Sequence, residues 1–260
     1  MAEATPVQIF HMEEKRRQYH RASFYLKISV VALFLLVPFL FPSFKTVDLA
    51  VQIIIFGALV ASFDILLGYT GILSFGHGMF FGLGAYSMAF LLGKYGMPSY
   101  SNLALGFMVA AAASAILAML ISFLTLRVKA IFFAMITLAI AELAIVLFTK
   151  LSGLTGGEDG ISFMTPGIFS VAFSIGTFMG VEITGKIITY YFILLSCLGL
   201  FLMMLRFTHS PLGRVLQAIR DNTQRAEALG NRTFVYQSIS ITFGCVMAAI
   251  IGGLYAMWME

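Results

Sequence analysis

The chain has 260 residues, of which 60% are hydrophobic and only 11% are charged, and its formal net charge is +4. Soluble domains are about half apolar and about a quarter charged, so this composition excludes an ordinary soluble enzyme and indicates a membrane protein. In a membrane protein a small positive excess is typical of cytoplasmic loops and does not point to nucleic-acid binding.

The first 23 residues are polar and basic, and an apolar run over 24–41 follows them. A basic segment before an apolar run can begin a secretory signal. No small-residue cleavage site follows this run, however, which ends in the sequence PFLFP over 38–42. We therefore expect 1–23 to be a cytoplasmic tail and 24–41 to be an uncleaved first span.

Seven stretches are apolar and long enough, or nearly so, to cross a membrane, since a helix needs about 20 residues to span a hydrocarbon core of about 30 Å. We therefore predict an all-α fold, a polytopic transmembrane helix bundle that forms one transmembrane domain over 24–260. The third stretch is short, and a polar, glycine-rich segment from Gly68 to Gly78 precedes it. Backbone that leaves a helix at membrane depth must be covered by protein or water, so 68–93 is either a re-entrant element with a helix or one plain span. The stretches run over 24–41, 47–67, 79–93, 102–125, 130–150, 187–205 and 234–258.

Lysines and arginines predict the orientation, because cytoplasmic loops carry an excess of them. A cytoplasmic N-terminus places 12 of the 16 basic residues inside and 4 outside, which favours an odd number of crossings. The inner residues are Lys15, Arg16, Arg17, Arg21, Lys27, Arg127, Lys129, Arg206, Arg214, Arg220, Arg225 and Arg232, and the outer ones are Lys45, Lys94, Lys150 and Lys186.

Two acids, Asp64 and Glu142, lie within the predicted spans. A charged residue at a helix centre costs about 2.5–3.5 kcal/mol on insertion scales, so such an acid should face protein or water. The apolar residues around Glu142 offset this cost, and Asp64 is close enough to the inner surface to reach it. Insertion alone therefore does not demand a function for either acid.

The glycine-rich block from Gly68 to Gly84 also carries hydroxyls and an imidazole. Its glycines permit tight turns and close helix contacts, and Gly78 and Gly82 have a helix-packing spacing. Two interpretations stay open: the block lines a solute path or its gate, or its glycines only pack helices. The candidate path residues are Asp64, Gly68, Tyr69, Gly71, Ser74, Gly76, His77, Thr137 and Glu142.

Two segments outside the spans stand out. The outer one, 151–186, is rich in Gly, Ser and Thr, and its acids lack the spacing of a calcium loop, so no metal site is predicted. The inner one, 206–233, has a helix start at Ser210-Pro211 and a helix stop at Gly230. Its apolar residues recur at helical spacing, which predicts one or two amphipathic helices that rest on lipid or dock into a partner. These apolar residues are Leu212, Val215, Leu216, Ile219, Ala226 and Leu229.

Three blocks, all within 65–258, resemble permeases of the branched-chain amino-acid ABC importer family, and the second of its two permease types fits better. They read LGYTGILSFGHG over 67–78, LRVKAIFFAMITLAIAE over 126–142 with LTGGEDGI over 154–161, and GRVLQAIRDNTQRAEALG over 213–230. Family members usually continue beyond the helix that ends near Trp258. We therefore expect either a truncated chain or a divergent copy.

The resemblance implies a permease subunit in the cell inner membrane that is not itself an enzyme and binds no cofactor. Its expected partners are the bilayer, a second permease subunit, two ATPase subunits that use ATP and Mg, and an external solute-binding protein that docks over 151–186. The solute would be branched-chain or other amino acids, with urea, short amides and small aromatic acids also open. The residues expected to couple to the ATPase are Arg214, Ala218, Ile219, Arg220, Asp221, Glu227, Ala228, Leu229 and Gly230.

The main alternative is an ion- or proton-coupled secondary transporter, because broken helices and isolated membrane acids suit that class as well. A membrane-embedded enzyme is disfavoured, since the four histidines do not cluster along the sequence. Cys197 and Cys245 lie in apolar runs without metal-ligand spacing, so we expect both to be small core residues.

Overall fold

The computed structural model describes residues 25, 28–41, 43–93, 98–126, 128, 130–170, 173–178 and 181–259. The predicted cytoplasmic tail over 1–23 lies outside the described residues. The chain divides into two compact units, Met1–Ala50 and Val51–Glu260. The predicted first span, 24–41, corresponds in the first unit to a short apolar helix, Ile28–Leu40.

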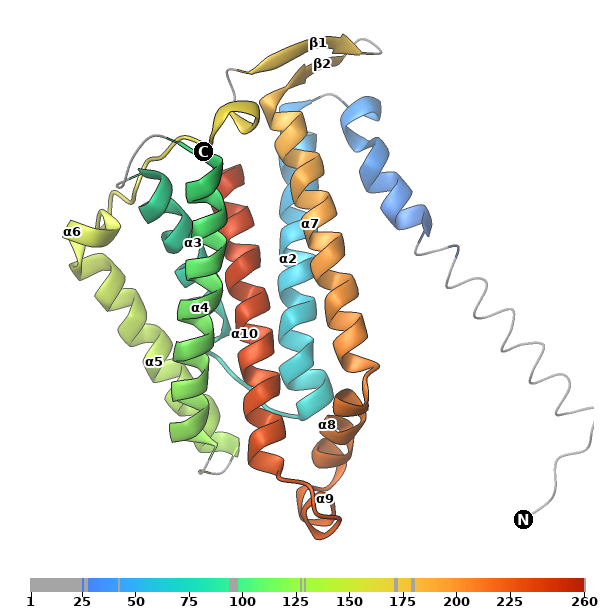
Figure 1. Ribbon diagram of the computed structural model, residues 1–260, viewed down its shortest axis with the longest axis vertical. Coiled ribbons are helices and arrows are strands. Elements are labelled where there is room, and N and C mark those ends of the chain that lie inside the picture. Colours follow the sequence, from blue (N-terminus) through green and yellow to red (C-terminus); the bar gives the residue numbers. More distant parts are fainter. Residues whose placement is uncertain are drawn as a thin grey trace, which may run out of the picture. The chain divides into compact units, whose positions relative to one another are not determined.

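Five helices in the described part of the chain are long and apolar enough to cross a membrane, which confirms a polytopic helical membrane protein. A sixth helix, α3, has 17 residues, fewer than the roughly 20 that a complete crossing needs. All seven predicted stretches therefore contain helix, but not all are full spans. The six helices in chain order are α2 (Phe44–Asp64, continued by η1 to Thr70), α3 (His77–Gly93), α4 (Tyr100–Thr125), α5 (Ala130–Lys150), α7 (Gly185–Thr208) and α10 (Thr233–Trp258) (Figure 1).

The connection from α2 to α3 is not helical throughout. The π-helical turn η1 (Ile65–Thr70) extends α2, and Gly71 then takes a left-handed conformation with φ 72°. Residues 71–76 have no regular helix, and α3 begins at His77. The alternative of one plain helical span over 68–93 is therefore wrong, and this region is a break followed by a short helix.

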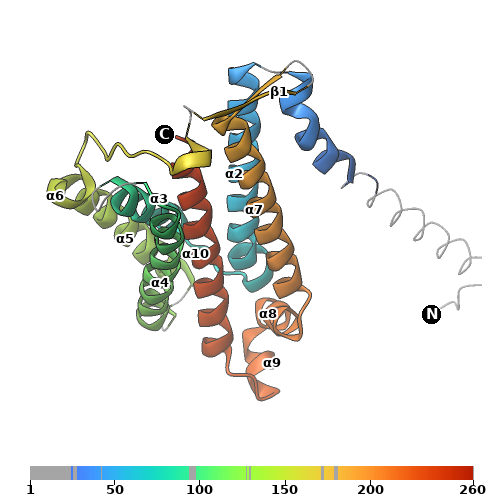
Figure 2. The ribbon, with the colours of Figure 1, turned by 45° about the horizontal axis from the view of Figure 1, so that its top comes forward.

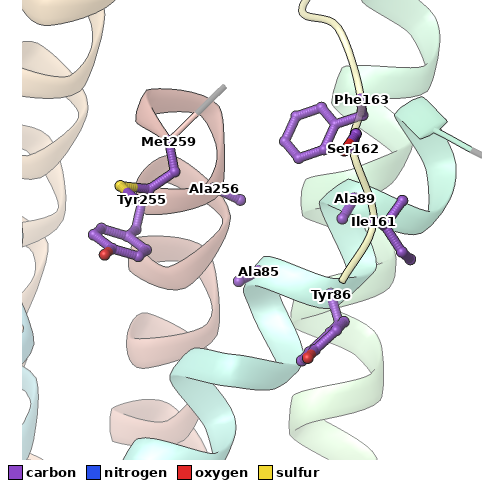
Figure 3. A pocket seen from close by; sticks show the side chains of 9 residues that line it. All are labelled: Ala85, Tyr86, Ala89, Ile161, Ser162, Phe163, Tyr255, Ala256 and Met259. Atoms are coloured by element: carbon purple, nitrogen blue, oxygen red, sulfur yellow. The ribbon is translucent and has the colours of Figure 1, made fainter. Parts of the chain in front are cut away.

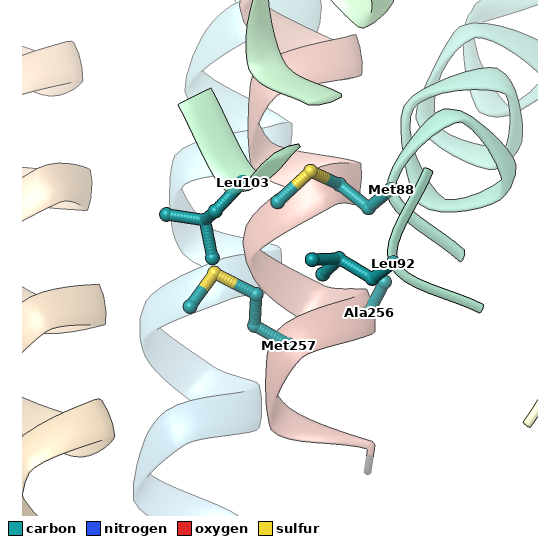
Figure 4. Close-up of a cluster of buried hydrophobic side chains, with 5 residues drawn as sticks. All are labelled: Met88, Leu92, Leu103, Ala256 and Met257. Carbon is teal, nitrogen blue, oxygen red and sulfur yellow. The ribbon is translucent and has the colours of Figure 1, made fainter. Parts of the chain in front are cut away.

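Helix α10 forms the centre of the second unit, with α3, α4 and α7 around it (Figure 1 and Figure 2). Glycines bring α3 and α10 together at backbone distance: a Cβ added to Gly84 would lie 1.8 Å from the carbonyl oxygen of Ala249. Small residues allow this kind of approach between membrane helices. A cluster from α3, α4 and α10 fills one end of the contact, and its buried members are Met88, Leu92, Leu103, Ala256 and Met257 (Figure 4).

The two cysteines pack inside the bundle. Cys197 lies on α7 and Cys245 on α10, and both are buried and unbridged. The prediction that they are core residues is confirmed.

The segment between α5 and α7 contains a small β-hairpin that the sequence analysis did not predict. After α6 (Ser152–Thr155) and the 3-10 turn η2 (Gly167–Phe169), strands β1 (Ser174–Phe178) and β2 (Val181–Thr184) pair antiparallel. The hairpin lies at the end of the bundle where α7 begins (Figure 1). We call this the hairpin end, and the all-α prediction holds for the membrane-spanning part.

Two short helices connect α7 to α10 at the opposite end of the bundle, which we call the coupling end (Figure 1). Helix α8 (Pro211–Asp221) starts as predicted, because Ser210 Oγ accepts a hydrogen bond from the Gly213 amide at 3.4 Å. Helix α9 (Thr223–Ala228) follows after Asn222, and Gly230 ends it with φ 87°. The predicted helix stop at Gly230 is confirmed.

Candidate translocation and coupling site

The coupling segment, residues 211–230, packs one face against the bundle. Leu216 and Ile219 of α8 and Ala226 of α9 are at most 2% exposed. Leu229 was predicted to continue this apolar face, but it is 77% exposed. That prediction is wrong because Asn222 leaves the helical conformation, with φ −160°, and so α9 does not continue the helical register of α8.

Most of the residues predicted to couple to an ATPase are exposed on this segment. Ile219 differs, because it is only 1% exposed and therefore holds α8 onto the membrane helices instead of facing outward. The exposed residues are Arg214, Ala218, Arg220, Asp221, Glu227, Ala228, Leu229 and Gly230.

Arg220 ties the coupling segment to the break after α2. Its Nη1 donates a hydrogen bond to the carbonyl oxygen of Gly68, within η1. A Cβ at Gly71 would lie 3.0 Å from Cγ of Arg220, so the arginine stem lies against this glycine. The side chain of Asp64 also lies over Gly68, where a Cβ would meet its Oδ1 at 2.2 Å. Three candidate path residues, Asp64, Gly68 and Gly71, thus surround the contact with Arg220.

A second contact ties the coupling segment to α10. The hydroxyl of Thr233, the first residue of α10, donates to Glu227 Oε1 at 2.6 Å. The side-chain amide of Asn231 donates to the carbonyl oxygen of Ala226 at 3.2 Å, which closes the turn between the two helices. Helix α9 is therefore bonded directly to the start of α10, so a displacement of α9 would be passed to α10.

The broken segment itself is held by side chains of distant helices. At its start, the hydroxyls of Thr70 and Ser240 of α10 are 2.7 Å apart. Further along, the Phe75 amide donates to Thr137 Oγ1 of α5 at 3.2 Å. Gly76 lies against Thr137, where a Cβ would be 3.0 Å from the backbone oxygen. Because Thr137 is only 3% exposed, it clamps the break and does not line an open path.

His77 is also part of the packed interior, at 6% exposure. Its Nε2 lies 2.8 Å from Ser62 Oγ, and that hydroxyl donates its proton to the Leu59 carbonyl at 2.7 Å. Ser62 therefore accepts from His77, which places the imidazole proton on Nε2. The ring also packs on Phe63, with centroids 5.4 Å apart. These contacts make His77 a packing residue in this structure.

Two other candidate path residues lie along the same break. Ser74 is 7% exposed and points inward from the non-helical segment. Tyr69 is partly buried within η1. Neither lines one of the cavities described here.

Glu142 opens onto a cavity of about 370 Å³ between α3 and α5. Gly78 and Gly82 line the same cavity, and a Cβ on either would meet nothing within 4 Å. The interpretation of this pair as a helix-packing motif is therefore wrong. The close contact is made instead by Gly84, whose role the sequence did not distinguish from that of its neighbours.

Two further cavities lie towards the ends of the bundle. One of about 300 Å³ at the coupling end is lined by Gly71, Arg220 and Gln237 among others. Another of about 420 Å³ lies between α3, α10 and residues 161–163, towards the hairpin end (Figure 3). Tyr86 lines both this cavity and the α3–α5 cavity, and its ring stacks on Phe148 at 4.7 Å between centroids. No local pattern in the sequence pairs Tyr86 with Phe148.

Comparison with known proteins agrees with this arrangement. Residues 45–260 match the family described as the branched-chain amino acid transport system / permease component. No solved structure gives a significant match to the chain.

Three relatives carry the name LivM. The high-affinity branched-chain amino acid transport system permease protein LivM of Salmonella typhimurium is 30% identical over 226 residues, which cover 81% of this chain and 52% of the relative. The protein of the same name from Escherichia coli is 30% identical over 248 residues, covering 88% of this chain and 57% of the relative. A probable branched-chain amino acid transport permease protein LivM of Methanocaldococcus jannaschii is 27% identical over 132 residues, 51% of this chain and 35% of the relative.

The chain thus spans about half the length of the curated relatives that it matches. The family match nevertheless covers every helix of the second unit, including the break after α2 and the coupling segment. This chain belongs to the permease-component family of branched-chain amino acid transport systems.

Proposed function

We propose that this chain is a membrane-spanning permease subunit of an ABC importer that moves small polar solutes, with branched-chain amino acids as the expected cargo. The observation that carries the proposal is the coupling segment. It lies outside the membrane helices, exposes a leucine, and bonds both to the break after α2 and to the start of α10. A secondary transporter needs no such surface for an energising partner.

Leu229 is the expected anchor for an ATPase subunit. It lies outside the membrane helices, and its exposed fraction of 77% is the largest among the exposed large hydrophobic residues that the structure describes. Ala228 and Gly230 beside it are exposed and small, so a partner groove can close around the leucine. Apolar anchors at the tip of a short helix are a usual way to dock into a groove.

The two contacts of the coupling segment suggest how its movement reaches the membrane. Arg220 would carry a displacement to the backbone of η1, and Glu227 would carry it to Thr233 at the start of α10. The displacement would also reach the non-helical residues 71–76, because Thr70, directly before them, hydrogen-bonds to Ser240 of α10. A push on the coupling segment would then shift α3 relative to α5.

The remaining parts of the proposal follow from the family and the charge pattern. The coupling end and the N-terminus would be cytoplasmic, because most lysines and arginines fall on that side, and the membrane would be the cell inner membrane. A second permease subunit would complete the path, an external solute-binding protein would dock over 151–186, and two ATPase subunits would hydrolyse ATP with Mg. This chain itself would bind neither ATP nor Mg.

Capture of the ATPase subunit tests the proposal. The full chain is co-expressed with the ATPase subunits of its own operon and purified in detergent, as wild type, as Leu229→Arg and as a Glu227→Arg, Gly230→Arg double variant. Both variants should lose the ATPase. Because Gly230 has φ 87°, its replacement also strains the turn, so Leu229→Arg is the cleaner of the two.

Gln217→Arg is the matched control, since Gln217 is exposed on α8 of the same segment but is not among the expected docking residues. It should retain the ATPase. If the wild-type chain captures no ATPase, the permease proposal fails. A secondary transporter would then be favoured, with Asp64 and Glu142 as its first ion-coupling candidates.

A further inference from the structure

We propose that the cavity between α3 and α5 is a solute site that takes an aliphatic α-amino acid and binds its ammonium group at Glu142. The proposal rests on the proposed function, because it names where the permease would hold its cargo. It is carried by the position of Glu142, the lining of the cavity and the way α5 leaves the bundle.

Helix α5 is buried against the bundle only in its first half, and in its second half the ring of Phe148 contacts Tyr86 of α3. Phe133, Ala134 and Thr137 are buried, whereas no residue over 138–150 is buried. The clamp between Thr137 and Phe75 marks the point where α5 leaves the bundle, and the cavity lies beyond it. The space is therefore built into the helix arrangement and is not a gap left by one small side chain.

Glu142 lies deep within the span. It follows Ala130 by 12 residues and precedes Lys150 by 8, which at about 1.5 Å per residue is about 18 Å and 12 Å from the ends of α5. Its side chain is exposed. Among the described residues that line the cavity, no lysine, arginine or histidine faces this carboxylate. A carboxylate at that depth requires water or a cation, and a bound ammonium group supplies the cation.

The rest of the cavity lining suits the aliphatic side chain of such an amino acid. Leu138, Ile145 and Met79 present aliphatic surface, while Gly78 and Gly82 leave the backbone of α3 open to the cavity. A volume of about 370 Å³ is near the lower end of ligand pockets, which suits a small molecule. Glu142 is the one charged residue of this lining, and Tyr86 and Thr149 add hydroxyl groups. The cavity thus offers a carboxylate for the ammonium group, the Tyr86 hydroxyl as a donor for the solute's carboxylate, and aliphatic surface for its side chain.

The stacked rings of Tyr86 and Phe148 form the wall towards the hairpin end. Since Tyr86 also lines the neighbouring cavity shown in Figure 3, this wall separates two successive compartments. A solute that enters from the hairpin end would pass the first cavity, cross the aromatic pair and reach Glu142. The order of the compartments agrees with import towards the coupling end.

The first test compares leucine with 4-methylpentanoate, which has the same carbon skeleton without the amino group. Uptake of each is measured for the full chain with its operon partners in cells that lack other leucine importers. Glu142→Gln should lower leucine uptake by about tenfold, the loss expected for one charge-assisted hydrogen bond. It should also reduce the preference for leucine over 4-methylpentanoate, while ATPase capture stays at the wild-type level.

The second test fills the cavity without touching the acid. Gly82→Leu and Gly199→Leu are matched, because a Cβ at either position meets nothing within 4 Å and both glycines lie in apolar helices. Only Gly82 lines the cavity. Gly82→Leu should abolish leucine uptake, and Gly199→Leu should leave it unchanged, with equal amounts of both variants in the membrane.

The outcomes separate this site from the proposed function. If the wild type captures the ATPase but Glu142→Gln and Gly82→Leu import leucine as the wild type does, the solute site is wrong and the permease function stands. If Glu142→Gln lowers uptake but leaves the preference for leucine unchanged, the ammonium contact is overturned. If the wild type imports other solutes but no leucine, the assigned substrate class is wrong.

Discussion

The two sides of α3 use glycine in opposite ways. On the side that faces α10, Gly84 meets the backbone of Ala249, and Gly252 meets the backbone of Phe81 at 1.9 Å from a hypothetical Cβ. On the side that faces α5, Gly78 and Gly82 meet nothing within 4 Å and open onto the cavity with Glu142. One short helix thus meets α10 at backbone distance on one side, while on the other side its glycines leave open space and the stacked rings of Tyr86 and Phe148 make the contact with α5.

The largest effect is expected on the side of α3 that faces α10. Gly84→Ala places a Cβ inside the space of the Ala249 carbonyl, so α3 and α10 must shift apart where these two residues meet. We expect a loss of about 3 kcal/mol in the free energy of unfolding, the upper part of the usual range for overpacking. Thermal unfolding of the purified chain in detergent measures the loss. An unchanged midpoint would show that this contact does not hold the bundle.

A smaller loss is expected where α5 clamps the break. Thr137→Val removes the oxygen that accepts from the Phe75 amide and leaves a partly buried N–H without this partner. The expected cost is about 1–3 kcal/mol, whereas Thr137→Ser keeps the hydroxyl and should cost less. The same unfolding measurement compares the two variants. Equal losses would mean that the methyl group of Thr137, and not its hydrogen bond, stabilises the segment.

The smallest effect, of opposite sign, is expected on the side of α3 that faces α5. Gly82→Ala adds a methyl group in open space and improves helix propensity, so the chain should gain about 0.5–1 kcal/mol. Gly82 and Gly84 lie two residues apart on one helix, so the difference between the unfolding free energies of Gly82→Ala and Gly84→Ala compares the two sides of α3 directly. A loss at Gly82 as large as that at Gly84 would show that α5 packs against α3 as tightly as α10 does.

The helices and the ends of the coupling segment could be predicted from local chemistry. Long apolar runs define spans, Ser210 with Pro211 defines a helix start, and Gly230 defines a stop, because each depends on neighbouring residues only. The break near Gly71 was one of the two alternatives that the glycine-rich sequence left open for 68–93. Family membership was indicated by motifs in the same local segments, and the match over 45–260 confirmed it.

Features that depend on distant residues were not predictable from one sequence. The spacing of Gly78 and Gly82 suits packing, yet which face of α3 meets α10 depends on where α10 lies. Leu229 fits the apolar period of α8, but the period is interrupted at Asn222.

The sequence contains one local pattern typical of strands at the hairpin. β-Branched residues occupy alternate positions, at Ile175 and Thr177 and again at Val181 and Ile183. Four to five residues per strand are too few for that signal to stand out within a loop.

The break after α2 also constrains the order in which the protein can be built. Phe75 bonds to Thr137, 62 residues later, and Thr70 bonds to Ser240, 170 residues later. Polar backbone without partners is costly in lipid, so this stretch cannot settle in the bilayer as soon as the ribosome has made it. The segment can therefore take its final position only after α5 and α10 have been synthesised and inserted. A mutation late in the chain can therefore leave an early segment outside the membrane.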